Sequence, residues 1–314
     1  MDKNNRQTFK TEFRAMGTTV SADIVLEKTK EDSARKAFRE IRTIFEKNEK
    51  IFSRFRPDSE LSKINQNLGK EIRVSPEMLE VLELCLKFNK ISEGYFDPRV
   101  IENLERIGYD KDFKSHDFND RSGKEIFLEK IEGGLEDDLI IDARMRAVTI
   151  KKRIDTTGIA KGYTVDEAAN YLSEKGFQNF IVDAGGDMLA QGVNDEGEDW
   201  RIGIEGLEDD RLMLKLKNEG IATSGISRKR WTIGGRKFHH LVNPKDPENF
   251  SYEIKTVTVI AEKTVEADGR AKVLVLMGKE KGLEFADRHD LKALFLDYKG
   301  NIYLSRRMKE NILS

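Results

Sequence analysis

Two stretches of the chain combine glycines with charged side chains where a strand gives way to a turn or a helix. The first, Ile154–Leu172, reads IDTTGIAKGYTVDEAANYL and predicts a strand end, a glycine turn and a helix that begins near Ile159. Asp155 precedes the turn, and Lys161 falls in the first helical turn. A helix N-terminus offers unpaired N–H groups and the positive end of the helix dipole. An added ammonium group makes this position suited to a phosphate.

The second stretch, Asn179–Gly192, is an apolar strand that runs into Gly185-Gly186-Asp187. Paired glycines let another backbone or a ligand approach closely. Together the two stretches predict an anion of nucleotide size held between two strand ends. Neither stretch contains the pattern G-x-G-x-x-G or G-x-x-x-x-G-K-[ST], so a Rossmann or Walker phosphate site is not supported. Plain structural turns are the alternative for each stretch.

Two adjacent histidines, His239 and His240, stand in the predicted strand KFHHLVNP. Because neighbouring strand residues face opposite sides of a sheet, at most one of them enters a given site. A lone strand histidine is commonly structural. A histidine beside a phosphate is a candidate general base, since its ordinary pKa of about 6.5 suits that work.

Asp268 lies near the start of a helix predicted over Thr264–Met277. Its carboxylate is either an electrostatic partner of that helix N-terminus or a ligand for Mg²⁺, which takes carboxylate, carbonyl and phosphate oxygens. Lys272 follows one turn later on the same face. The structural alternative is therefore an i,i+4 ion pair, worth about 0.3–0.5 kcal/mol at an exposed position.

Aromatic side chains stand beside turn residues at Phe55, Tyr95 and Phe96. They either pack at the edge of the core or flank a planar ring system in a site. The segment 95–98 follows a predicted helix that ends at Gly94, and we expect it to form an exposed loop. The hydroxyls of the segment 223–224 are weaker candidates for a ligand contact.

The elements that must position these residues are short strands interleaved with helices. A strand pair is predicted over Phe9–Leu26, interrupted at 16–19, and a long amphipathic helix follows with an apolar stripe that reaches Phe52. Ser59 and Ser75 are predicted helix N-caps. Further strands are predicted over 147–154, 180–182, 200–204, 212–216, 220–223, 237–242, 255–261, 294–296 and 302–304. This pattern predicts an α+β protein with mixed, largely antiparallel sheets packed with helices.

The chain has 314 residues, enough for one large domain or two ordinary ones. We predict a single catalytic region over 9–305, with two closely packed subdomains as the alternative. The segment 108–138 is rich in charge and glycine and has little periodicity, which predicts a charged surface insertion. Residues 306–314 are predicted to form a C-terminal tail.

Composition excludes several classes of protein. The 55 Lys and Arg residues are balanced by 57 Asp and Glu residues, so the chain lacks the basic excess of nucleic-acid-binding proteins, and we expect no nucleic-acid partner. The single cysteine, Cys85, lies at helical spacing with Leu82 and Leu86, which predicts a buried thiol. No apolar run approaches the ~18 residues of a membrane span. The N-terminus has no apolar signal core, so the chain is either cytoplasmic or the mature form of an exported periplasmic protein or lipoprotein.

Taken in order, blocks of this sequence resemble one family, the FAD:protein FMN transferases, also called ApbE-type flavin transferases. The resemblance runs from Phe13 to Gly278, nearly the whole chain. The blocks are FRAMGTTVSADI, FSRFRPDSELSKIN, GYFDP, IDTTGIAKGYTVDEAA, FIVDAGGDMLAQG, IATSG, HHLVNP and KTVTVIAEKTVEADGRAKVLVLMG. The resemblance implies an ApbE-like, T-fold-like architecture. It also implies Mg²⁺-assisted transfer of FMN from FAD to a Thr or Ser hydroxyl of an acceptor protein, with AMP as leaving group.

The same resemblance implies a role for each matching position. His240 would activate the acceptor hydroxyl as the catalytic base, and Asp268 would act in catalysis as a metal ligand together with the carbonyl of Gly158. Asp155 and Lys161 would hold FAD. The other residues implied to contact FAD are Met16, Phe55, Tyr95, Phe96, Asp97 and Val242.

The chain departs from the family pattern at two places. Lys272 stands where the family often has a Thr that helps to bind magnesium, and an ammonium does not ligate a cation. We therefore expect weakened magnesium dependence or an altered metal site. Asn243 replaces the family's acid before the proline, and the following loop, KDPENF, lacks the usual Thr-Gly turn, which bears on acceptor choice. An FAD-binding protein without transfer and a pyrophosphatase that yields FMN and AMP are the alternative functions.

Overall fold

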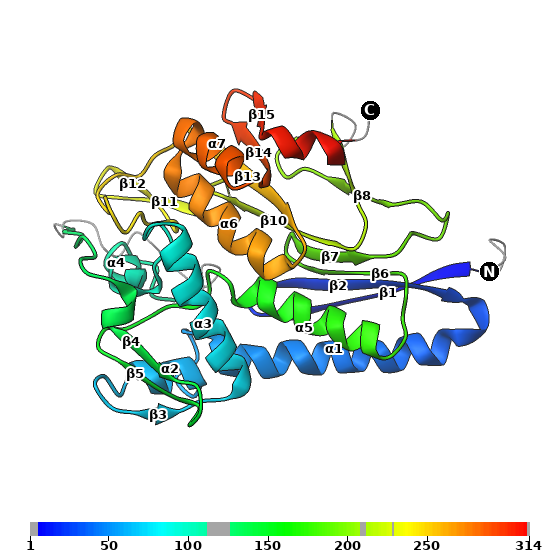
Figure 1. The fold of residues 1–314 in the computed structure, drawn as a ribbon, viewed down its shortest axis with the longest axis horizontal. Coiled ribbons are helices and arrows are strands. Elements are labelled where there is room, and N and C mark those ends of the chain that lie inside the picture. The colour runs from blue at the N-terminus through cyan, green and yellow to red at the C-terminus, as the bar shows by residue number, and fades with distance from the viewer. Residues whose placement is uncertain (1–5, 112–125, 208–211, 228, 313–314) are drawn as a thin grey trace.

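The protein is an α+β structure built on one large antiparallel sheet, with helices across one face and a smaller part at one end (Figure 1). The computed structural model describes residues 6–111, 126–207, 212–227 and 229–312. Every neighbouring pair in the large sheet is antiparallel. In sheet order, its strands are β1 (Arg6–Ala15), β2 (Thr18–Glu27), β6 (Phe180–Ala184), β7 (Asp187–Gln191), β10 (Glu219–Gly225), β13 (Ile254–Ala261), β14 (Lys292–Asp297) and β15 (Ile302–Leu304).

The helices that cover the sheet bury their apolar stripes against its strands (Figure 1). They are α1 (Glu31–Phe52), α5 (Ala160–Glu174), α6 (Thr264–Met277) and α7 (Lys279–Arg288). The predicted stripe of α1 is confirmed, because Ile41 and Phe45 are fully buried against β1, β2 and α5. Under α6 and α7 lies a second cluster that includes Val257 of β13 and Phe295 of β14.

The smaller part packs against the end of the sheet at which α5 begins (Figure 1). Its three-stranded antiparallel sheet has the order β3-β5-β4. Its elements are α2 (Glu60–Asn65), β3 (Ile72–Arg73), α3 (Pro76–Ile91), η3 (Pro98–Val100), α4 (Ile101–Arg106), η6 (Leu135–Asp137), β4 (Leu139–Asp142) and β5 (Ala147–Ile150). A shared core joins the two parts, since Phe88 of α3 lies in one cluster with Ile159 and Val265.

Two hairpin turns reach the same end of the large sheet. The turn at 16–17 joins β1 to β2 with φ angles of 50° and 71°, and the turn at 185–186 joins β6 to β7 with φ angles of 68° and 100°. Positive φ at both central residues is the type I′ geometry, which matches the twist of paired strands. Met16 adopts this left-handed conformation without being glycine. A Cβ on Gly185 would collide with Thr18 Oγ1, so the two turns touch each other.

Most of the sequence-based elements are confirmed, and a few are wrong or were missed. Ser59 and Ser75 cap α2 and α3 by accepting hydrogen bonds from backbone N–H groups, and α6 has the predicted bounds. The strand predicted over 147–154 ends at Ile150, because the chain turns there toward α5. Helices α4 and α7 and strands β3, β4, β7 and β11 were not predicted. The two remaining hairpins are β8 (Trp200–Gly203) with β9 (Met213–Leu216) and β11 (Arg230–Ile233) with β12 (Arg236–His239).

The structure describes only parts of the predicted insertion, 108–138, and of the predicted C-terminal tail, 306–314. Residues 112–125 of the predicted insertion lie outside the described residues, and 126–134 form no helix or strand. Leu135, at its C-terminal end, is fully buried. Of the predicted tail, 306–312 is described, and it contains η7 (Arg306–Asn311), where Met308 is fully buried.

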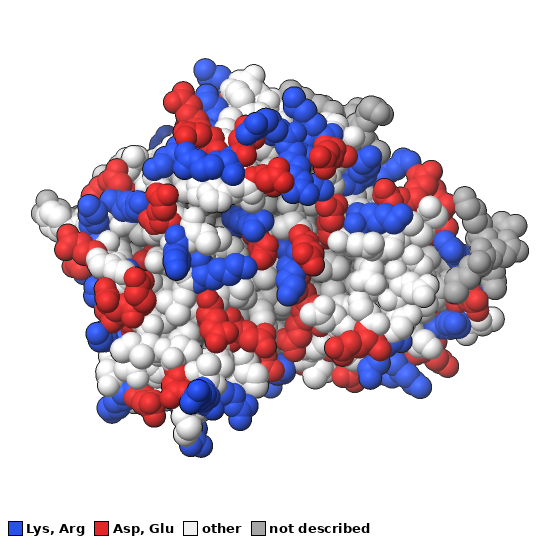
Figure 2. Space-filling model, viewed as in Figure 1, with Lys and Arg blue, Asp and Glu red and all other residues white. Residues whose placement is uncertain are grey.

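Surface charge agrees with the even composition. Basic and acidic side chains are interspersed over the face that Figure 2 shows, without a large area of one sign. Cys85 is fully buried, and burial raises the pKa of its thiol, as expected for a core cysteine. Within the described ranges, no helix is long and apolar enough to cross a membrane.

Candidate active site

A cavity of about 710 Å³ opens where the end of the large sheet meets the smaller part. This volume falls within the range of about 300–1,000 Å³ that is usual for ligand sites. The cavity is lined by both hairpin turns, the end of α1, the segment 95–98, the turn before α5, the end of β10, the segment 240–244 and one side of α6. Every site residue predicted from the sequence lines it: Met16, Phe55, Tyr95, Phe96, Asp97, Asp155, Gly158, Lys161, His240, Val242 and Asp268.

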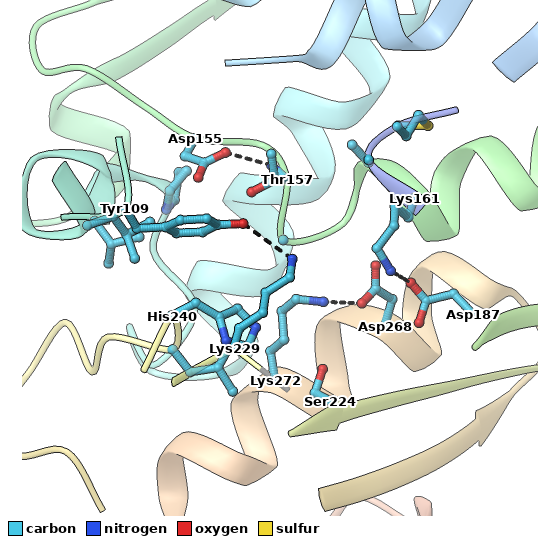
Figure 3. A pocket seen from close by; sticks show the side chains of 18 of the residues that line it. Tyr109, Asp155, Thr157, Lys161, Asp187, Ser224, Lys229, His240, Asp268 and Lys272 are labelled. Carbon is cyan, nitrogen blue, oxygen red and sulfur yellow. Dashed lines mark hydrogen bonds and ion pairs between the residues drawn. The ribbon is translucent and has the colours of Figure 1, made fainter. Parts of the chain in front are cut away.

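Two lysine–carboxylate ion pairs lie side by side in this cavity (Figure 3). Lys161, in the first turn of α5, pairs with Asp187 at the start of β7, and Lys272 pairs with Asp268 one turn earlier on α6. The i,i+4 ion pair between Asp268 and Lys272, one of the two sequence-based alternatives, is thus formed. Both carboxylates are deeply buried, with side-chain exposures of 2% for Asp187 and 1% for Asp268. The lysines are more exposed, at 28% and 17%, and reach the cavity.

Close packing of α5 against α6 brings the two pairs together. Gly162 provides the space, because a Cβ at that position would lie 2.8 Å from Val265 Cα and 3.0 Å from Asp268 Cβ. Asp166 of α5 adds a polar link, since its carboxylate accepts hydrogen bonds from the backbone N–H groups of Thr264 at 2.8 Å and Val265 at 2.9 Å. These N–H groups belong to the first turn of α6 and have no partner within the helix. A carboxylate from a neighbouring helix therefore caps α6.

The charges of the cluster depend on one another. Burial alone would lower the pKa of Lys161, but the neighbouring Asp187 and Asp268 carboxylates outweigh burial, and the pKa is raised. Burial and the nearby Asp268 raise the pKa of Asp187 to about 6, although Lys161 and Lys272 oppose this. The ammonium of Lys161 is consequently charged throughout the physiological pH range.

His240 enters the cavity and His239 does not, so only one of the two histidines reaches the site, as predicted. The strand predicted over 237–242 was too long, because β12 ends at His239 and His240 lies just beyond it. His239 is buried on the other side, between the rings of Phe250 and Tyr252. Burial lowers the pKa of His240 well below its ordinary value, and the positive charges of Lys229 and Lys272 add to this effect. His240 is therefore a neutral imidazole at pH 7.

The Nδ1 atom of His240 is buried and finds no hydrogen-bond partner within the described part of the chain. The ring of Tyr109 stands edge-on to the imidazole, with centroids 6.4 Å apart. A neutral imidazole with a nitrogen that makes no protein hydrogen bond has the chemistry of a proton acceptor.

Asp155 is held by its surroundings on the opposite wall. Its carboxylate accepts a hydrogen bond from Thr157 N–H at 2.8 Å and lies 3.2 Å from the Nε atom of Arg54. The guanidinium of Arg54 is stacked on the rings of Phe55 and Tyr109, 4.4 Å and 4.6 Å from their centroids. Arg54 thereby ties the carboxylate to the aromatic side chains of Phe55 and Tyr109, which also line the cavity.

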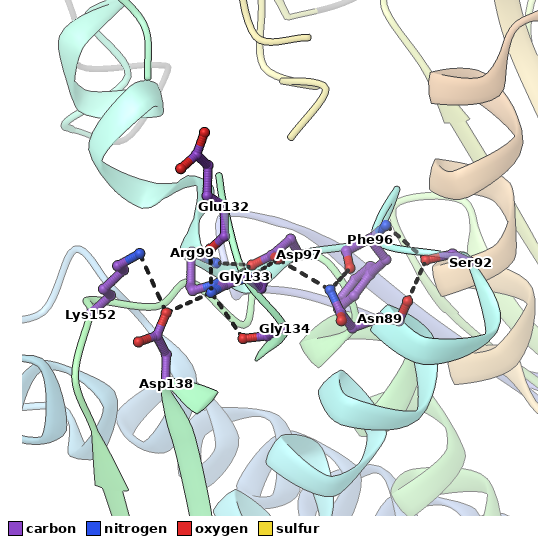
Figure 4. Close-up of polar contacts among 10 residues, drawn as sticks. All are labelled: Asn89, Ser92, Phe96, Asp97, Arg99, Glu132, Gly133, Gly134, Asp138 and Lys152. Atoms are coloured by element: carbon purple, nitrogen blue, oxygen red, sulfur yellow. Dashed lines mark hydrogen bonds and ion pairs between the residues drawn. The ribbon is translucent and has the colours of Figure 1, made fainter. Parts of the chain in front are cut away.

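The segment 95–98 is buried, so its prediction as an exposed loop was wrong. The reason is a polar network beneath it (Figure 4). Asp97 pairs with Arg99 through two hydrogen bonds of 2.7 Å and 3.0 Å and accepts a third from Asn89. Arg99 also pairs with Asp138 at the start of the small sheet. With every charge paired, the loop is able to lie inside the protein.

The role predicted for Asp97 is constrained by this network. Its carboxylate is bound by Arg99 and Asn89. Asp97 therefore contributes to the cavity chiefly by holding the segment 95–98 in place. The neighbouring ring of Phe96 lies against Gly158, where a Cβ would come within 3.1 Å of Phe96 Cε2. Tyr95, at the same edge, is flanked by the ammonium groups of Lys245 and Lys281, each 4.8 Å from the ring centroid.

Some lining residues were not recognised as site residues from the sequence. Asp187 had a local signal, because an acid directly follows the paired glycines of a hairpin turn. Lys229 and Tyr109 had none: they lie 120 positions apart, and only the fold joins the ammonium to the tyrosine oxygen at 3.2 Å.

The residues present do not fit a resident divalent cation. Asp268 and Asp187 are each already paired with an ammonium group. The cluster is neutral as it stands, and a divalent ion would add two positive charges beside two lysines. Across the described residues, no group of three or more His, Cys, Asp and Glu side chains is arranged to hold a metal ion.

Comparison with known proteins places this chain in one family. The sequence model of the ApbE family matches residues 16–295. The chain is 28% identical over 307 residues to the FAD:protein FMN transferase of Haemophilus influenzae, an alignment that covers 93% of this chain and 87% of the relative. It is 29% identical over 287 residues to the FAD:protein FMN transferase of Vibrio cholerae, covering 90% and 85%.

Solved structures share the same fold. The ApbE protein of Thermotoga maritima superposes with a TM-score of 0.81 at 24% identity, covering 98% of this chain and all of the other. The apo form of the Pseudomonas stutzeri flavinyl transferase ApbE gives 0.80 at 23% identity with both chains fully covered. The chain thus has the α+β fold of the ApbE structures. The chain belongs to the ApbE family.

Proposed function

We propose that this protein is an FAD:protein FMN transferase. It moves the FMN half of FAD to a Thr or Ser hydroxyl of an acceptor protein and releases AMP. The observation that carries the proposal is the convergence of a neutral His240 and the Lys161 and Lys272 ammonium groups on one cavity, in a chain of the ApbE family. FAD is the substrate, and magnesium is not part of the proposal.

The arrangement suits phosphoryl transfer, in which positioning and charge neutralisation supply most of the catalysis. The aromatic wall formed by Phe55 and Tyr109 accepts the planar ring system, beside Met16 and Val242. The pyrophosphate lies toward Lys161 and Lys272, whose positive charges oppose the negative charge of the phosphates. The N-terminus of α5 adds its dipole at the same place.

His240 takes the proton of the acceptor hydroxyl. The hydroxyl oxygen forms a bond to the phosphorus on the FMN side, and the bond from that phosphorus to the bridging pyrophosphate oxygen breaks. The bridging oxygen leaves with AMP. The products are therefore a phosphoester between FMN and the acceptor, AMP and a proton that His240 releases to solvent.

The test is an intact-mass assay with FAD and Thr-containing acceptor peptides. We expect a peptide that gains the mass of the FMN group, with one AMP released for each peptide. His240→Gln should abolish the gain, whereas His239→Gln, a matched change of the adjacent histidine outside the cavity, should preserve it. AMP without labelled peptide would instead support the pyrophosphatase, and bound unchanged FAD would support the binding protein.

A further inference from the structure

Four charged groups form the floor of the cavity, and their charges cancel. Lys161 and Lys272 supply two positive charges, and Asp187 and Asp268 supply two negative ones (Figure 3). Because the carboxylates are nearly inaccessible and the lysines reach the cavity, an entering anion meets the ammonium groups first. The side chains thus present positive charge to a pyrophosphate without any metal ion.

Lys272 lies between Asp268 and the turn before α5. Its ammonium contacts Asp268 Oδ1, and its stem runs past the turn before α5, since a Cβ on Gly158 would lie 3.7 Å from Lys272 Cδ. Asp268 and Gly158 are the two positions from which cation ligands were predicted. An ammonium and a divalent ion between the same two positions would repel each other at a separation of a few ångströms.

We infer that the ammonium of Lys272, held by Asp268, replaces a divalent cation at the pyrophosphate, so that this protein transfers FMN without a bound metal. This inference rests on the proposed function and specifies how the same site neutralises its substrate. The second oxygen of Asp268 has no hydrogen-bond partner among the described residues. A short hydroxyl side chain at 272 would leave both oxygens of Asp268 available and so open a place for a cation.

Helix α6 offers a matched control for the loss of Lys272. Arg270 makes an i,i+4 ion pair with Glu266 at 3.1 Å, with the same spacing and orientation as the pair of Lys272 with Asp268. Arg270 does not line the cavity. Comparing Lys272→Thr with Arg270→Thr therefore separates the loss of the cavity charge from the loss of a helical ion pair.

The first measurement is transfer activity of the wild-type protein, dialysed against EDTA, with and without added Mg²⁺. We expect rates that agree within about twofold, and a dependence of tenfold or more on Mg²⁺ would overturn the inference. Lys272→Thr should lose at least tenfold of its rate in EDTA and regain part of it with Mg²⁺, whereas Arg270→Thr should behave as wild type. A Lys272→Thr rate in EDTA equal to that of wild type would also contradict the inference.

The second measurement needs no activity. Mn²⁺ is titrated into the EDTA-treated full chain, and the signal of the free ion is followed by electron paramagnetic resonance. Wild type and Arg270→Thr should leave this signal unchanged, whereas Mn²⁺ binding by wild type that Asp268→Asn abolishes would overturn the inference. If no variant transfers FMN under any condition, the proposed function fails, and the Mn²⁺ titration of the wild type still decides the question of the cation.

Discussion

Replacing Gly162 by alanine tests how the active-site charges are brought together. The new Cβ would lie 2.8 Å from Val265 Cα and 2.9 Å from the carbonyl oxygen of Thr264. Both atoms belong to the backbone of α6, so no side-chain rotation relieves the clash. Helix α6 must move away from α5, and with it Asp268 and Lys272 must move away from Lys161.

The magnitude follows from two opposing effects. Alanine in a helix interior is favoured over glycine by about 1 kcal/mol, whereas overpacking in a close contact costs about 1–3 kcal/mol. Because the contact here is with backbone, we take the upper part of that range and expect a net loss of about 1–2 kcal/mol in the free energy of unfolding. A displacement of a few tenths of an ångström to 1 Å at the site should lower the rate of FMN transfer by roughly tenfold, and by no more than about 100-fold.

The assay pairs urea unfolding with transfer activity, and Gly282→Ala is the matched control. A Cβ on Gly282 would lie 2.9 Å from the Phe295 ring and 3.0 Å from the carbonyl oxygen of Leu274, a similar clash on α7 outside the cavity. We expect both variants to lose stability and only Gly162→Ala to lose activity. The reasoning is refuted if Gly162→Ala is as stable as wild type, or if the two variants lose activity equally.

Three further predictions concern His240, His239 and Arg99. Because the pKa of His240 lies well below 6.5, the transfer rate should stay flat from pH 8 to 6.5, and a rate already halved at pH 6.5 would contradict this. Burial lowers the pKa of His239 to about 4 from 6.5, so the unfolded chain binds the proton first. The free energy of unfolding therefore falls by about 3 kcal/mol as pH falls from about 6.5 to 4. His239→Phe should remove this part of the loss, as measured by acid unfolding curves of the variant and the wild type. An unchanged curve for the variant would contradict the prediction. Arg99→Met leaves the Asp97 carboxylate buried without its cation and should lower the free energy of unfolding in urea by about 3–5 kcal/mol. Arg99→Lys keeps the charge and should have a stability between those of the Met variant and the wild type. A Met variant as stable as the wild type would show that the network is dispensable.

Much of the local structure could be predicted because its signals are local. Ser59 and Ser75 predict helix N-termini because a serine hydroxyl accepts a hydrogen bond from a free N–H group of the first helical turn. The alternation of apolar residues in β2 predicts a strand. The segment 95–98 could not be placed in this way. Its polar and aromatic residues are typical of an exposed loop. It is buried because Arg99 and Asn89, on the elements that flank it, donate hydrogen bonds to the Asp97 carboxylate.

The same division holds for the candidate site. Residues of the site that belong to glycine turns and helix starts, such as Asp155 and Lys161, were found from their neighbours in sequence. Asp187 also directly follows a glycine turn, but its pairing with Lys161 depends on how α5 packs beside β7. Lys229 gained its place in the site only through the fold, which brings it to Tyr109 across 120 positions of the chain. Helix α4 was missed because six residues carry too little periodicity and, unlike α2, it has no capping side chain at its N-terminus.

By itself the sequence determined the family, the α+β class and the candidate residues, because these depend on residue types and on spacing within single elements. Only the tertiary structure decided which charges neutralise one another. Ion pairing depends on distance in space, and the contact of Gly162 with α6 sets that distance for Lys161 and Asp268. The same contact places Lys272 where its positive charge meets the cavity, and no pattern along the chain contains that information.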